Sequence, residues 1–198
     1  KKGYSSGGSS AGSGVLVSIG EADMAMGGDQ GGSIRMPACW SGIVGHKPTH
    51  GLVPYTGVFP IEMTLDHTGP MARTVTDAAT LLQAIAGPDS HDPRQIGCKT
   101  QNYVKALAKG AKGLKVAILK EGFGHPESEK VVDQKVKAAA NSFKKLGATV
   151  KEVSMPMHLD GLHLWNAIAT EGATELMLKG NAFGTNWEGY YNTSLLDA

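Results

Sequence analysis

A glycine- and serine-rich stretch near the N-terminus, residues 7–37, constrains this chain more than any other part of its sequence. It reads GGSSAGSGVLVSIGEADMAMGGDQGGSIRMP, so that apolar residues repeatedly divide the small ones into clusters. A flexible linker lacks such apolar residues, whereas glycine clusters between apolar segments suit turns in which the backbone approaches something closely. The stretch is therefore predicted to be folded, and its loops are candidates for a functional site.

The second cluster, GGDQGGS at 27–33, does not suit phosphate binding. A Walker loop needs a lysine directly after its last glycine, and here a serine follows instead. Asp29 would also repel a phosphate, and no GxGxxG pattern is present. A phosphate-cradling loop is therefore disfavoured.

Nucleophilic catalysis fits the same cluster better. Ser33 follows an expected strand at 22–26 and precedes an expected helix at 34–41. Successive small residues at such a junction allow several backbone N–H groups to converge beside a serine, as in an oxyanion hole. Spacing alone gives equal weight to a plain helix-capping role for Ser33.

Two other serine patterns compete with Ser33. Ser10 lies in GSSAG, which matches the G-x-S-x-G nucleophile elbow. That elbow needs a strand directly before it, and residues 1–7 are too polar and glycine-rich to form one. Ser142 and Lys145 match S-x-x-K but are expected on the outer face of a helix. Both matches are interpreted as coincidental.

Hydrophobic periodicity predicts an α/β protein with a mixed sheet flanked by helices. The stretch from 114 to 153 is expected to be a strand–helix–strand unit with parallel strands. In the final helix, Trp165, Ile168 and Leu176 are expected to face inward, and Cys39 is expected to be a buried, reduced thiol. The expected helices lie at 15–19, 34–41, 75–86, 127–146 and 162–178, and the expected strands at 22–26, 43–44, 114–119 and 148–153.

Composition excludes several classes of partner. The 198 residues carry a formal net charge of +1, with lysines and arginines scattered singly, so nucleic acid is not an expected partner. No apolar run approaches the roughly 20 residues of a membrane helix. The histidines lack metal-ligand spacing, so no metal or other cofactor is expected. A reduced, cytoplasmic protein is predicted from the two isolated cysteines.

Four motifs together resemble the amidase signature family. The resemblance is dense over roughly the first 90 residues, continues loosely beyond them, and is highly specific because the signature is so extended. It implies an α/β/α amidase fold, incomplete in this chain, with a catalytic core at 1–95 and an α/β part of the same domain at 96–198. The motifs are GGSSAGS at 7–13, GGDQGGSIRMP at 27–37, GIVGHKPTHG at 42–51 and GPMART at 69–74.

The resemblance implies a Ser–cisSer–Lys triad. Ser33 matches the nucleophile, and Ser9 matches the bridging serine by its spacing, which Ser5 does not. The Gly8–Ser9 peptide is expected to be cis, and the hydroxyls of Ser9 and Ser33 are expected within hydrogen-bonding reach. The resemblance assigns the oxyanion hole to the N–H groups of Gln30, Gly31, Gly32 and Ser33, and supporting roles to Ser10, Asp29 and Arg35.

The catalytic lysine has no match in this chain. Family members carry it well upstream of the bridging serine, and Lys1 and Lys2 lie too close to Ser9. Lys47 belongs to a motif interpreted as structural. The chain therefore resembles a fragment, which is expected to be inactive alone although its parent should be an amidase.

Within the family, Gln30 and the stretch 51–71 resemble bacterial amidases of the nitrile-degrading pathway. A small-molecule carboxamide is then the expected substrate, hydrolysed through an acyl-enzyme, and the parent is a possible homodimer. Phe59, Pro60, Ile61 and Met63 either line an acyl pocket or form a packed surface loop. The alternatives are the ammonia-transferring subunit of a tRNA-dependent amidotransferase, which usually carries Thr at the position of Gln30, and an inactive fragment.

Overall fold

The computed structural model describes residues 3–179, which form two compact units. The first unit contains residues 3–106 and 167–179, and the second contains residues 107–166. The helices of the first unit are α1 (Ala11–Ile19), α2 (Arg35–Ser41), α3 (Val75–Ile85) and α4 (Tyr103–Ala106). Helix α6 (Gly161–Ala173) begins in the second unit and continues as a π-helical turn, Thr174–Leu178.

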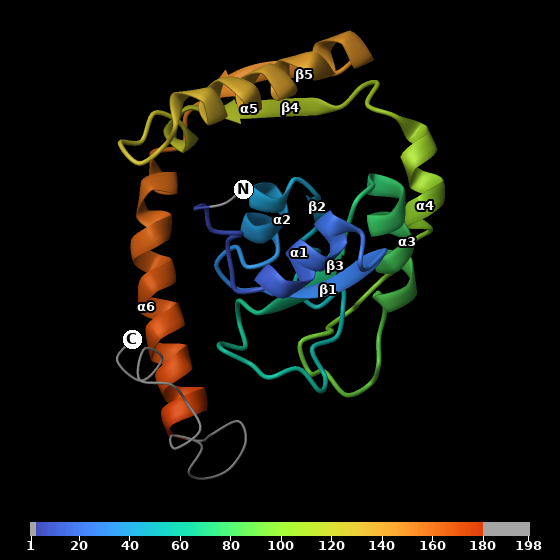
Figure 1. Cartoon of the computed structure of the whole chain (residues 1–198), viewed down its shortest axis with the longest axis vertical. Coiled ribbons are helices and arrows are strands. Elements are labelled where there is room, and N and C mark those ends of the chain that lie inside the picture. Colours follow the sequence, from blue (N-terminus) through green and yellow to red (C-terminus); the bar gives the residue numbers. More distant parts are fainter. Residues whose placement is uncertain (1–2, 180–198) are drawn as a thin grey trace. The chain divides into compact units, whose positions relative to one another are not determined.

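The first unit is built on an antiparallel sheet of three strands in the order β1-β3-β2 (Figure 1). These strands are β1 (Met24–Asp29), β2 (Val44–Gly45) and β3 (His67–Ala72). Ile34, Ala38 and Met71 form a fully buried cluster, against which Ile43 packs. The core therefore lies where the start of α2 meets the central strand, directly beside the glycine-rich loop.

Strand β3 was not expected from the sequence, because it contains Gly69 and Pro70. A proline inside a central strand normally removes a ladder hydrogen bond. Here Met26 is the partner of Pro70 in β1, and its carbonyl accepts a hydrogen bond from the hydroxyl of Ser13 at 2.8 Å. On the other side, the carbonyl of Pro70 accepts from the N–H of His46 at 3.0 Å. Pro70 therefore needs no N–H toward β1, and the side of the strand on which its N–H is missing faces His46, just past the end of β2, where the regular pairing stops.

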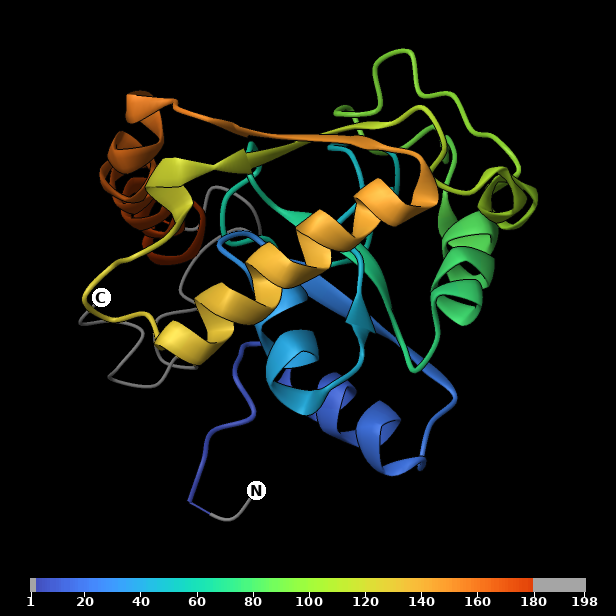
Figure 2. The same cartoon turned by 90° about the horizontal axis from the view of Figure 1, so that it is seen from above.

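The second unit confirms the predicted strand–helix–strand arrangement. Strands β4 (Lys115–Leu119) and β5 (Thr149–Val153) are parallel, and α5 (Lys130–Ser142) connects them. Figures 1 and 2 show α5 lying along this two-stranded sheet. A 3₁₀ segment, Phe143–Leu146, extends the helix to Gly147, whose φ of +84° ends it.

Some sequence expectations about local structure were wrong. The expected strand at 22–26 begins and ends later, at Met24–Asp29, because its glycines pair within the ladder. Cys39 is exposed rather than buried, although it is unpaired as expected. Ile168 is 41% exposed, whereas Trp165 and Leu176 are partly buried. Within residues 3–179, no helix is both long and apolar enough to cross a membrane.

Candidate active site

The loop between β1 and α2 is organised around the carboxylate of Asp29, which is 2% exposed. Its Oδ1 accepts a hydrogen bond from the N–H of Gly32 at 2.8 Å. Its Oδ2 accepts from the N–H groups of Ile34 at 3.2 Å and Arg35 at 3.3 Å. The guanidinium of Arg35 donates to both oxygens, at 2.9 and 3.0 Å. One carboxylate therefore closes the whole turn that carries Ser33.

Asp29 is held in its charged form by these contacts. Burial alone would raise its pKa, but the hydrogen bonds and charge of Arg35, together with the N–H groups of Ile34 and Arg35, outweigh burial. The pKa of Asp29 consequently lies below its ordinary value. The carboxylate acts as a fixed anion that orients the loop, not as a proton donor or acceptor near neutral pH.

The four N–H groups expected to form an oxyanion hole are not equivalent in the structure. That of Gly32 is already engaged by Asp29, and a hydrogen bond to a carboxylate is a strong one. Gly32 has a φ of +131°, which explains why glycine is required there. The N–H groups of Gln30, Gly31 and Ser33 are the donors that Asp29 does not hold.

The segment carrying Ser9 and Ser10 lies directly against Ser33. The N–H of Ser10, which belongs to the peptide joining it to Ser9, donates to the carbonyl of Ser33 at 3.3 Å. The peptide bond between Gly8 and Ser9 is cis, as the resemblance predicts. Among residues 3–179, the hydroxyls of Ser9 and Ser33 are not hydrogen-bonded to each other. Catalytic hydrogen bonds are often completed when substrate binds.

The hydroxyl of Ser10 ties this segment to strand β1. It accepts from the N–H of Gly28 at 3.0 Å and donates to the carbonyl of the same residue at 3.2 Å. Ser10 precedes α1 without making a side-chain capping bond, because its hydroxyl is used on the strand instead. A Cβ on Gly7 would lie 3.0 Å from the backbone of Pro37, so the segment is also closely packed on α2.

The geometry argues against two simpler interpretations of the serines. The residue that caps α2 is Ile34, and no side chain makes the capping bond, so Ser33 is not an N-cap serine. Residues 3–10 contain no strand, so the nucleophile elbow around Ser10 lacks its required context. Ser142 donates to the carbonyl of Ala139 on an exposed face of α5, as expected.

Lys47 proves to be close to the loop, a relationship that the sequence did not reveal. Its Nζ lies 3.1 Å from Nε2 of His67, which pairs with Asp29 across β1 and β3. The Nδ1 of His67 donates to the carbonyl of Leu65 at 2.6 Å, so Nε2 is the acceptor for the ammonium. Burial, followed by the charge of Arg35, lowers the pKa of Lys47. Strand pairing, which is non-local, creates this contact.

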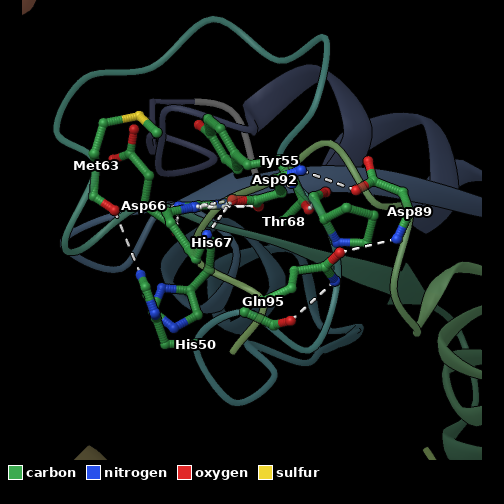
Figure 3. Close-up of polar contacts among 12 residues, drawn as sticks. His50, Tyr55, Met63, Asp66, His67, Thr68, Asp89, Asp92 and Gln95 are labelled. Atoms are coloured by element: carbon green, nitrogen blue, oxygen red, sulfur yellow. Dashed lines mark hydrogen bonds and ion pairs between the residues drawn. The ribbon is translucent and has the colours of Figure 1, made fainter. Parts of the chain in front are cut away.

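Two histidines, His46 and His67, lie beside Lys47, and a third, His50, contacts the ring of His67. The rings of His50 and His67 meet edge to face, with 5.2 Å between their centroids (Figure 3). Burial lowers the pKa of His67, as does the charge of Lys47, although the Leu65 carbonyl acts in the opposite direction. Burial also lowers the pKa of His46. In the described part of the chain, no group of three or more histidine, cysteine or acidic side chains could hold a metal ion.

Comparisons with known proteins agree on one family. A family model described as Amidase matches residues 1–193. An enantioselective amidase from Rhodococcus rhodochrous is 52% identical over 196 residues, which is 98% of this chain and 37% of that protein. The chain thus spans little more than a third of the length of this curated relative.

Solved structures give the same result. A glutamyl-tRNA(Gln) amidotransferase subunit from Thermotoga maritima superposes with a TM-score of 0.81 at 33% identity, over 93% of this chain and 39% of that one. A bacterial aryl acylamidase described as an amidase signature enzyme superposes with a TM-score of 0.80 at 28% identity, over 97% of this chain and 41% of that one. The mixed α/β architecture is therefore that of these enzymes.

Proposed function

The chain belongs to the amidase signature family, and from this premise we propose that the full-length protein is an amidohydrolase with Ser33 as its nucleophile. The observation that carries the proposal is the hydrogen bond from the Ser10 N–H to the Ser33 carbonyl. This hydrogen bond joins the segment that carries Ser9 to the Ser33 loop, which the carboxylate of Asp29 closes.

In the proposed reaction, Oγ of Ser33 attacks the carbonyl carbon of a carboxamide and loses its proton to the hydroxyl of Ser9. Ser9 passes its own proton to a neutral lysine, for which this chain has no match. An unactivated serine is a weak nucleophile, and such a relay supplies the base that it needs. Collapse of the tetrahedral intermediate releases ammonia, which takes a proton back, and leaves an ester on Ser33. Water then hydrolyses that ester to the carboxylate.

The negative charge of the tetrahedral intermediate would be stabilised by backbone donors. We assign this role to the N–H groups of Gln30, Gly31 and Ser33, because that of Gly32 is bonded to Asp29. One oxyanion-hole donor is worth about 3–4 kcal/mol in transition-state stabilisation. Asp29, Arg35 and Ser10 would support the site by holding its backbone.

The proposed substrate is a small aliphatic or aromatic amide. The side-chain nitrogen of Gln30 is buried and finds no acceptor among residues 3–179, so a substrate oxygen would satisfy it. The relative from Rhodococcus rhodochrous is described as an enantioselective amidase. A homodimer, a cytoplasmic location and the absence of a nucleic-acid partner belong to the same proposal, with the two unpaired cysteines in keeping with a reducing compartment.

A serine-directed fluorophosphonate tests the proposal on the full-length protein. Mass spectrometry of the labelled protein is expected to place the adduct on Ser33, and Ser33→Ala is expected to abolish both labelling and amide hydrolysis. An adduct on Ser10 would instead support the nucleophile elbow, and an active Ser33→Ala variant would refute the assignment.

An amidotransferase component is a second candidate, since the Thermotoga maritima protein of that kind is so similar in structure. Gln30 argues against it, because those proteins usually carry threonine at this position. Copurification with a second protein chain, together with activity that requires both ATP and tRNA, would favour this alternative. Hydrolysis of simple amides by the purified full-length protein without either would favour the free amidase.

A further inference from the structure

The loop at 61–66 is held together by hydrogen bonds between its backbone N–H groups and its own two carboxylates. The Oδ2 of Asp66 accepts from the N–H groups of Ile61 and Glu62, at 2.6 and 3.0 Å. The carboxylate of Glu62 in turn accepts from the N–H groups of Thr64 and Leu65, both at 2.8 Å. Both acidic residues are buried. The two carboxylates thus cap opposite ends of the loop and fix its backbone.

Arg94, from a distant segment, donates hydrogen bonds to two carbonyl groups of this loop. Its Nη1 donates to the carbonyl of Met63 at 3.2 Å and to that of Asp66 at 2.9 Å. The other side of the guanidinium donates to Asp92, with Nε 2.9 Å from Oδ1 and Nη2 2.7 Å from Oδ2. The side chains of Arg94 and Asp92 are 9% and 2% exposed. Arg94 is therefore a buried clamp between two segments.

Two further contacts fix the clamp itself. The guanidinium carbon of Arg94 lies 4.8 Å from the centre of the Tyr55 ring. The carboxylate of Asp92 also accepts from the N–H of Tyr55 at 2.8 Å, a contact that Figure 3 shows. The hydrogen bonds from Arg94 lower the pKa of Asp92 well below its ordinary value, although burial opposes them. The carboxylate of Asp92 is therefore charged at neutral pH, as the ion pair requires.

The clamped loop lies at the same end of the sheet as the candidate active site. Strand β1 ends at Asp29, strand β3 begins at His67, and these two residues are partners in the antiparallel ladder. The Ser33 loop therefore leaves the sheet where the 61–66 loop enters it. Met63 and, just before the loop, Phe59 keep part of their side chains accessible.

We propose that Arg94 is a positioning residue for acyl-group selectivity, acting through the carbonyls of Met63 and Asp66. This inference rests on the proposed amidase function. By fixing the 61–66 loop beside the Ser33 loop, Arg94 would set the space available to the acyl group of the substrate. Arginine is required because a planar guanidinium can serve a carboxylate and two carbonyls at once, whereas a lysine ammonium cannot match that geometry.

The test uses the full-length protein and the Arg94→Lys variant. We measure kcat and KM for acetamide, propionamide, isobutyramide and benzamide. The variant is expected to change the ratio of kcat/KM between the largest and smallest amides by about tenfold, within the range that a pocket wall controls. The kcat for acetamide is expected to change by no more than about threefold, because Arg94 does not contact the reacting atoms.

Arg73→Lys is the matched control. Arg73 also pairs with an aspartate, Asp23, at 3.4 Å, but that pair is exposed and lies beyond the far end of β3. The Arg73→Lys variant should therefore keep the parental ratio of kcat/KM between the largest and smallest amides. A uniform fall in kcat/KM for every amide in Arg94→Lys, or an unchanged ratio, would overturn the inference. If the parent protein hydrolyses no amide, the proposed function itself fails, so the two failures are distinguishable.

A second variant keeps the test decisive if Arg94→Lys does not fold. Arg94 lines a surface cavity of about 480 Å³, together with Gln95 and His50, so the space left by removing its side chain would adjoin that cavity. Arg94→Ala, refolded with methylguanidinium, is expected to regain both stability and the parental selectivity ratio. Recovery of stability with an altered ratio would show that the cation restores structure alone, and would overturn the positioning role.

Discussion

Asp29 and His67 are partners across strands β1 and β3. This pairing places His67, which contacts the ammonium of Lys47, directly beside the loop that carries Ser33. The Nε2 of His67 lies 3.1 Å from Nζ of Lys47. Protonating His67 would place a second positive charge against that ammonium. The contact with Lys47 thus favours the neutral form of His67 in the folded protein.

We therefore expect stability to fall on mild acidification. The pKa of His67 is lowered by burial and by Lys47, and that of His46 is lowered by burial, so these two histidines bind more protons in the unfolded chain than in the folded one below their ordinary pKa of 6.5. The free energy of unfolding, measured in urea, should decrease as the pH falls from about 7.5 to about 5. His67→Gln should reduce this slope, whereas the exposed His91→Gln should not. Equal slopes in both variants would contradict the prediction.

Removing the charge of Asp29 should loosen the loop without changing its shape greatly. Asp29→Asn removes the charge and replaces one accepting oxygen by an NH2 group, so the hydrogen bonds that this oxygen accepts from Gly32, or from Ile34 and Arg35, are lost and the others are weakened. We expect the free energy of unfolding to fall by about 2 kcal/mol, the usual scale for bonds to a charged group. Amide hydrolysis by the full-length protein should fall as well. Asp23→Asn, in an exposed pair with Arg73, is the control and should be nearly neutral.

Neighbouring glycines in β1 should respond very differently to a methyl group. A Cβ on Gly27 would lie 2.9 Å from Cγ1 of Ile34 and 2.9 Å from Sδ of Met71, in the core. A Cβ on Gly28 would have its nearest neighbour, the carbonyl oxygen of His67, at 3.9 Å. Thermal unfolding should show Gly27→Ala destabilised by about 1–3 kcal/mol and Gly28→Ala nearly unchanged. A reversed order would mean that this packing is wrong.

Ser10→Ala should affect the site through the backbone. The substitution leaves the N–H and carbonyl of Gly28 without the hydroxyl that serves both. An unsatisfied, partly buried donor costs about 1–3 kcal/mol. We expect a loss of stability on this scale and a fall in kcat much smaller than for Ser33→Ala. Ser5→Ala, in an exposed turn, provides the comparison. Loss of kcat equal to that of Ser33→Ala would point to a direct catalytic role for Ser10.

The part of the site that sequence reasoning found is the part that is local in the chain. Asp29, Arg35 and the intervening glycines form one turn, and every contact within it spans a few residues. The family resemblance adds Ser9 and Ser10, which lie further away. Composition and spacing alone do not distinguish a nucleophilic Ser33 from a serine that caps the following helix.

The part that was missed depends on non-local pairing. Strand β3 contains a Gly-Pro pair that argues against a strand, and only the ladder shows that Pro70 needs no N–H toward β1. Without β3, nothing indicates that His67 approaches Lys47 or that Arg94 reaches the 61–66 loop. A signal was available in the closely spaced acidic residues Glu62 and Asp66, which are typical of side-chain capping in turns.

The hydroxyls of Ser10 and Ser13 have a consequence beyond catalysis. They occupy the carbonyl of Met26 and both polar groups of Gly28, along the border of β1 that faces away from β3. An exposed strand border with unpaired amides is a template for association with another chain. By bonding to the backbone of Met26 and Gly28, these two serines prevent another strand from pairing there. Replacing them would be expected to favour aggregation as well as to disturb the site.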